Sequence, residues 1–61
     1  MRLPNDPAML LSVVNMKLRD FYPDLDELCK AEDADRAAIE QKLGALKYVY
    51  LPERNQFVYR P

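Results

Sequence analysis

Residues 48–59, Tyr-Val-Tyr-Leu-Pro-Glu-Arg-Asn-Gln-Phe-Val-Tyr, decide how the C-terminal part of the chain folds. Two β-prone runs, 48–51 and 57–59, flank the segment 52–55, in which proline suits the first corner of a turn and asparagine a left-handed position. This pattern predicts a β-hairpin over about residues 48–60. A two-stranded hairpin is marginally stable alone, so it must pack on the preceding part of the chain.

Two helices are expected in the first half of the chain, each opened by an aspartate. The first covers about residues 6–22, because Asp6 can cap it and Pro23 disfavours helical geometry in the residue before it. Its apolar residues recur at helical spacing and define a core face. The second covers about residues 24–32 and starts with a capping box at Asp24.

A third helix is expected over about residues 35–47, with its cap at Asp35. Gly44 offers an earlier end, but Leu46 continues the inward apolar stripe, so the longer helix is preferred. The chain is then a single domain over residues 1–61, mainly α with a small β part: three helices plus a C-terminal β-hairpin, in the order of a winged helix-turn-helix. Periodicity predicts a buried core of Leu18, Phe21, Leu28, Ile39, Leu43, Leu46 and Phe57.

The composition excludes most kinds of catalytic and metal site. The 61 residues include no histidine and one cysteine, so no histidine-assisted nucleophile, four-ligand zinc site or internal disulfide can form. Acidic residues cluster over 24–35, but a calcium loop needs a glycine at its sharp turn, and the single glycine, Gly44, lies elsewhere. Helix capping is the simpler role for these carboxylates. We expect no enzymatic activity, no metal and no cofactor.

The N-terminal residues do not have the composition of an export signal. Pro4 and Pro7 interrupt the apolar residues, and the run 8–14 is far too short for a membrane helix. We therefore expect a cytoplasmic protein that makes no membrane contact. In that compartment Cys29, on the inner face of the second helix, is expected to be a reduced, buried thiol with a structural role.

Two stretches of the chain carry a family resemblance. The opening reads Leu-Pro-Asn-Asp-Pro at 3–7, Met-Leu-Leu-Ser at 9–12, and then Asn15 and Lys-Leu-Arg-Asp at 17–20. The close reads Tyr48-x-Tyr50 and then Glu-Arg-Asn-Gln-Phe at 53–57. Together they resemble a short bacterial family known only as a domain of unknown function. The resemblance covers nearly the whole chain and implies a stand-alone bacterial protein without an assigned activity. The chain departs from it at Lys47, where the resemblance implies a glycine.

Charge is unevenly distributed along the chain, although the net value is only −1. Residues 1–19 carry +2, residues 20–35 carry −6 and residues 36–61 carry +3. The last segment holds the third helix and the hairpin, the two parts of a winged helix that meet DNA. DNA binding is therefore the alternative function, although the acidic second helix would face the same duplex. The contacts it predicts are Arg36, Gln41, Lys42, Lys47 and Arg54.

The first helix carries a second apolar stripe that favours contact with protein. Met9, Val13 and Met16 recur on the side away from the core face, and methionine is common at binding surfaces. Either the hairpin covers this stripe or a partner does. A second copy of the chain is one such partner, because small domains gain burial by oligomerising.

The third helix offers another surface for contact. Ala37, Gln41 and Ala45 lie opposite its inward stripe, and small residues allow another element to approach closely. The same residues also suit a smooth face covered only by water. Taken together, these patterns predict a small, non-enzymatic interaction module. A homodimer or a protein partner is favoured over nucleic acid.

Overall fold

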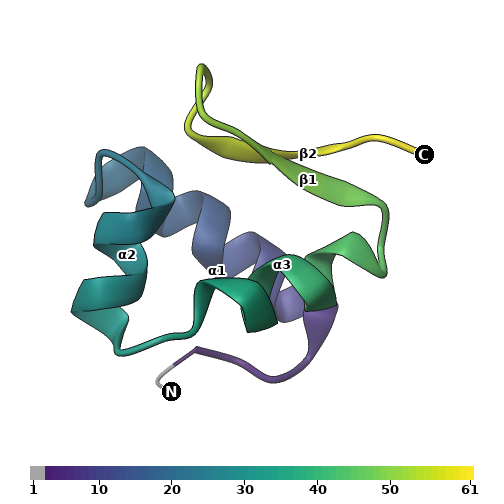
Figure 1. Ribbon diagram of the computed structural model, residues 1–61, viewed down its shortest axis with the longest axis horizontal. Helices are drawn as coiled ribbons and strands as arrows, with labels where there is room; N and C mark the ends of the chain where they lie inside the picture. The colour runs from purple at the N-terminus through teal and green to yellow at the C-terminus, as the bar shows by residue number, and fades with distance from the viewer. Residues whose placement is uncertain (1–2) are drawn as a thin grey trace.

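In the computed structural model, three helices are followed by a hairpin. The structure describes residues 3–61, so residues 1–2 of the predicted domain lie outside the described residues. The elements are α1 (Pro7–Asp20), α2 (Leu25–Glu32), α3 (Arg36–Gly44), β1 (Tyr48–Leu51) and β2 (Gln56–Tyr59). The strands pair antiparallel, and the hairpin lies across the helices (Figure 1). The mainly helical fold with a C-terminal hairpin is confirmed, and the winged helix-turn-helix likeness stays a prediction.

Each helix starts where an aspartate was expected to cap it. The side chains accept hydrogen bonds from backbone N–H groups in the first turn, at 3.0 Å for Asp6, 2.8 Å for Asp24 and 3.1 Å for Asp35. A cap of this kind stabilises a helix by about 1 kcal/mol relative to alanine. The start of each helix is therefore determined by residues close to it in the sequence, as predicted.

The third helix is shorter than predicted, because it ends at Gly44 and not near residue 47. The N–H of Ala45 still bonds four residues back, to Gln41. The following two bond only three residues back: Leu46 to the carbonyl of Leu43 at 3.0 Å, and Lys47 to that of Gly44 at 2.9 Å. Lys47 then adopts φ 68°, a left-handed conformation that turns the chain into β1. Glycine adopts this conformation without cost, which gives a physical reason for the glycine that the resemblance implies here.

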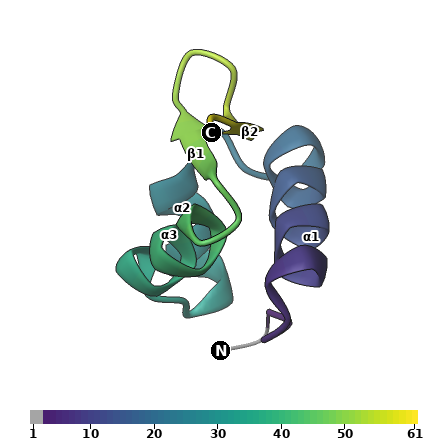
Figure 2. The ribbon, with the colours of Figure 1, turned by 90° about the vertical axis from the view of Figure 1, so that its right-hand side faces the viewer.

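The core lies between the helices and the inner face of the hairpin. Of the predicted core, Leu18, Leu28, Ile39, Leu43 and Phe57 are buried, which confirms those five assignments. The rest of the buried apolar residues are Leu3, Leu10, Val14, Leu25 and Cys29. In the view of Figure 2, α1 stands on one side, α2 and α3 on the other, and the hairpin above.

Two predicted core residues are exposed instead, both because their helix ends early. Phe21 follows the last residue of α1 and has φ −126°, so its side chain leaves the helical stripe and is 67% exposed. It lies under the ammonium group of Lys17, at 5.9 Å from the ring centroid. Leu46 lies in the turn after α3 and is 36% exposed. The prediction that these two residues are buried is wrong.

A buried carboxylate joins the first two helices. Glu32 at the end of α2 is 8% exposed. Its Oε2 lies 3.2 Å from Lys17 Nζ and accepts a hydrogen bond from the Tyr22 hydroxyl at 2.8 Å. Removing one partner from such a group is costly, because the charge is left buried without compensation. The contact therefore helps to fix α2 against α1.

Candidate functional site

One side chain of α1 acts as a partner for the outer edge of β2. Asn15 donates through Nδ2 to the carbonyl of Phe57 at 3.1 Å and accepts from the N–H of Phe57 at 2.8 Å. Both backbone groups of an edge-strand residue are thereby satisfied without a third strand. The hairpin is held at a fixed position beside α1 by this pair of bonds.

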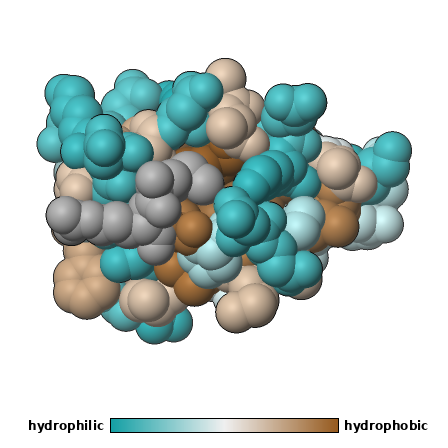
Figure 3. Space-filling model, turned by 90° about the horizontal axis from the view of Figure 1, so that it is seen from below, coloured by the Kyte–Doolittle hydropathy of each residue, from teal (hydrophilic) through white to brown (hydrophobic). Residues whose placement is uncertain are grey.

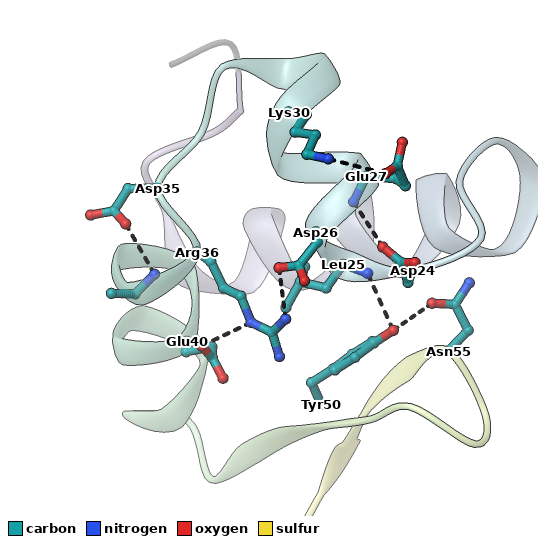
Figure 4. Close-up of polar contacts among 11 residues, drawn as sticks. Asp24, Leu25, Asp26, Glu27, Lys30, Asp35, Arg36, Glu40, Tyr50 and Asn55 are labelled. Atoms are coloured by element: carbon teal, nitrogen blue, oxygen red, sulfur yellow. Dashed lines mark hydrogen bonds and ion pairs between the residues drawn. The ribbon is translucent and has the colours of Figure 1, made fainter.

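A second asparagine fixes the hairpin turn. Asn55 has φ 52°, a left-handed conformation that asparagine tolerates well. Its amide nitrogen donates to the carbonyls of Leu18 at 3.0 Å and Tyr22 at 2.9 Å, and its oxygen accepts from the Tyr50 hydroxyl at 2.8 Å. The same hydroxyl accepts from the N–H of Leu25 at 3.2 Å, so the turn is tied to α1 and to the start of α2 (Figure 4).

Between these two fixed points the surface is hollowed into a groove, which we call the α1–turn groove. It has a volume of about 580 Å³ and lies between α1 and the turn that precedes β2. Its lining residues are Ser12, Asn15, Met16, Leu18, Arg19, Arg54, Asn55 and Gln56. Because the two asparagines hold both walls, the groove is a built feature of the fold.

Of the polar side chains that line this groove, three make no hydrogen bond or ion pair within residues 3–61: Ser12, Arg54 and Gln56. Arg19 bonds only to its sequence neighbour Asp20, through Nε and Nη2, both at 2.9 Å. That hydrogen bond lowers the pKa of Asp20 and raises that of Arg19. The groove thus presents two guanidinium groups, one on each wall, and a hydroxyl and an amide that are free to bind.

The predicted apolar stripe of α1 is exposed at its two methionines. Met9 is 60% exposed and Met16 36% exposed, so the hairpin does not cover them, while Val13 is half-buried against the core. Met16 also lines the α1–turn groove, which makes the stripe and the groove neighbours. The predicted surface of α3 lies elsewhere, and its Ala37, Gln41 and Ala45 are all exposed.

The side chains predicted to contact DNA are not brought to one surface. Arg54 belongs to the α1–turn groove, whereas Arg36 lies between α2, α3 and β1 (Figure 4). The Arg36 guanidinium donates to Asp26 at 2.8 Å and to Glu40 at 3.2 Å, and it lies 5.5 Å from the ring centroid of Tyr50. The hydrogen bond to Asp26 raises the pKa of Arg36.

Of the other predicted contacts, Lys42 is bound within the chain, whereas Gln41 and Lys47 are exposed. Lys42 Nζ lies 3.4 Å from the backbone oxygen and 3.3 Å from the side-chain oxygen of Asn5, so it fastens α3 to the segment before α1. Gln41 and Lys47 are exposed, the latter in the turn that leads into β1. The face seen from below is a mosaic in which hydrophilic side chains separate smaller hydrophobic areas (Figure 3).

Cys29 is a buried, free thiol on α2. Burial in the core raises its pKa, so the neutral thiol is favoured and the nucleophilic thiolate is disfavoured. Over residues 3–61 no group of three or more cysteine or acidic side chains is placed to hold a metal ion. Across the same residues, no helix has the length and apolar character needed to cross a membrane.

The sequence of this chain matches a recognised family over most of its length. A family model described as a domain of unknown function, DUF4250, matches residues 4–57. The chain belongs to DUF4250. The predicted resemblance to a family of unknown function is thereby confirmed. Neither the curated proteins nor the solved structures include a match to the chain.

Many residues that carry the resemblance hold this DUF4250 domain together. Leu3 and Leu18 are buried, Asp6 caps α1, and Asn15 and Asn55 fix the hairpin. Sequence reasoning missed the α1–turn groove, which joins positions more than thirty residues apart in the chain. The available signal was that polar residues within the two matching stretches, such as Asn15 and Gln56, had no role in the predicted core, caps or turn.

Proposed function

We propose that this DUF4250 domain is a small, non-enzymatic interaction module that associates with a second copy through the α1 stripe of Met9, Val13 and Met16. The observation that carries the proposal is the exposure of Met9 and Met16 on a helix whose other face is fully packed. Methionine side chains adapt to irregular partners, which suits a surface that packs against itself. The cytoplasm suits a domain whose only thiol is free and buried.

The expected strength of this contact follows from its size. Each side chain of the stripe contributes about 1.5–3 kcal/mol when fully buried. Val13 is already half-buried and Met16 is 36% exposed, so the stripe gains less than three times this amount on association. Association costs an estimated 4–15 kcal/mol in lost freedom, so the stripe supports only a weak dimer. The expected dissociation constant is in the millimolar range, which corresponds to about 4 kcal/mol of net binding free energy.

Analytical ultracentrifugation across a hundredfold range of concentration tests the proposal. The wild-type chain should shift from monomer toward dimer as concentration rises, and Met16→Glu should abolish the shift by placing a charge in the contact. Leu46→Glu is the matched control, since Leu46 is equally exposed but lies outside the stripe. A wild type that stays monomeric throughout, or a Leu46→Glu variant that weakens association as much as Met16→Glu, would contradict the proposal.

DNA binding by α3 and the hairpin is the rival function. Its predicted contacts Arg36 and Lys42 are already engaged by groups of the same chain, and acidic Asp26 and Glu40 accompany Arg36. A phosphate contact made by either of these two residues must therefore displace an existing partner, which weakens the electrostatic attraction on which duplex binding depends. Fluorescence anisotropy with a labelled duplex at physiological salt should show at most weak, non-specific binding. A sub-micromolar complex that survives competitor DNA would reverse the order of the two functions.

A further inference from the structure

The α1–turn groove is a second candidate site, which adjoins the proposed self-association stripe at Met16. Its volume of about 580 Å³ falls in the range of ligand-binding pockets. Asn15 and Asn55 hold its two walls through hydrogen bonds to backbone groups of β2 and α1. A ligand would therefore enter a site that is already formed, which reduces the free energy spent on ordering the protein.

The groove carries positive charge on both walls. Arg54, on the turn, makes no ion pair within the described residues, and Arg19, on α1, is bound only to the exposed carboxylate of Asp20. Guanidinium groups bind carboxylates in a bidentate geometry through charge-assisted hydrogen bonds. Arg54 is available for such a pair, and Arg19 keeps Nη1 outside its two bonds to Asp20. The two groups therefore match a ligand that carries more than one carboxylate.

The rest of the lining narrows the class of ligand. The Ser12 hydroxyl and the Gln56 amide can bond to polar groups of a backbone, and Met16 supplies an apolar contact. Arg19 and Arg54 are the two basic residues of the lining, fewer than the several phosphate contacts from which nucleic acid binding draws its affinity. From this combination we propose that the groove binds a short peptide segment in which acidic and aliphatic residues alternate.

The proposal can be tested with the peptide acetyl-Glu-Leu-Glu-Leu-Glu-amide, titrated into the intact chain at a concentration where sedimentation shows it to be monomeric. Binding should shift the backbone amide signals of the groove residues in NMR spectra. Arg54→Gln removes the charge and keeps much of the side chain, and it should weaken binding about tenfold, as expected when one charge-assisted hydrogen-bonded contact is lost. Arg60→Gln is the matched control, because Arg60 is also exposed but does not line the groove, and its affinity should stay within twofold of the wild type.

Three further ligands distinguish carboxylate recognition from other chemistry. The isosteric peptide acetyl-Gln-Leu-Gln-Leu-Gln-amide should not bind, and inorganic phosphate and single-stranded oligothymidine should bind more weakly than the acidic peptide. Absence of peptide binding, equal binding of the glutamine peptide, equal loss with Arg54→Gln and Arg60→Gln, or tighter binding of phosphate or oligothymidine would overturn the proposal. The self-association test uses Met16→Glu and no peptide, so either proposal can fail while the other holds.

Discussion

The bond pair between Asn15 and Phe57 is the most direct test of how the hairpin is held. Replacing Asn15 with leucine keeps the side-chain bulk and removes both hydrogen bonds, at 3.1 and 2.8 Å, to the backbone of β2. A buried backbone group left without a partner costs about 1–3 kcal/mol, and both groups here are part-buried, so the expected loss is about 2–3 kcal/mol in total. In a domain of this size that corresponds to a melting temperature lower by about 10–20 °C.

Thermal unfolding followed by circular dichroism measures this loss, and hydrogen exchange locates it at the Phe57 amide. Ser12→Leu is the control, one turn earlier on the same helix, where the serine side chain makes no hydrogen bond within the described residues. It should change stability by no more than about 0.5 kcal/mol. An Asn15→Leu variant that melts within two degrees of the wild type, with the Phe57 amide still protected, would refute the reasoning.

Three further predictions concern the core, one turn and the thiol. Leu43→Ala should destabilise the fold by about 2–5 kcal/mol in urea unfolding, whereas Leu46→Ala, at an exposed position, should cost less than about 1 kcal/mol. Lys47→Gly should raise the melting temperature, because it relieves a left-handed conformation that costs an L-residue about 1–2 kcal/mol; a lowered melting temperature would contradict this. The pKa of Cys29 is raised in the folded state, so stability should fall as pH rises above the ordinary thiol value, and iodoacetamide should label the native thiol much more slowly than the urea-unfolded one; equal labelling rates would contradict burial.

The features that sequence predicted well are those set by neighbouring residues. Asp6, Asp24 and Asp35 each cap a helix because the cap and the N–H group it bonds lie within three positions of each other. The turn at 52–55 follows the same logic, with Asn55 in the left-handed position that its side chain tolerates. These local rules were sufficient to place every element of the fold in the right order.

The errors arose where periodicity was extended beyond the end of a helix. Leu46 fits the apolar stripe of α3 only while the α-helix continues. The N–H groups of Leu46 and Lys47 bond three residues back instead of four, so the α-helical spacing is lost at this point. Phe21 leaves the stripe of α1 for the same reason. A periodic pattern cannot by itself say where a helix ends, because the end depends on the tertiary contacts made by the residues that follow.

The α1–turn groove could not be predicted from the sequence, for a different reason. Its walls come from residues such as Ser12 and Arg54 that are brought together only when the hairpin docks. The docking depends on Asn15 and Asn55, and an asparagine in a sequence gives no sign of a partner 42 or 37 positions away. Only the exposed α1 stripe of Met9 and Met16 could be anticipated, because helical spacing alone defines it.

The way the hairpin is attached also bears on how the chain folds. The bonds of Asn15 and Asn55 to their backbone partners close loops of 33 to 42 residues, whereas each helix forms through contacts four residues apart. Closing long loops is slow compared with forming local structure, so we expect the hairpin to dock last. Until then Phe57 is exposed and the outer edge of β2 is open to pairing with another chain. The speed of this final docking step, more than the stability of the finished fold, then determines how long each new molecule is exposed to aggregation.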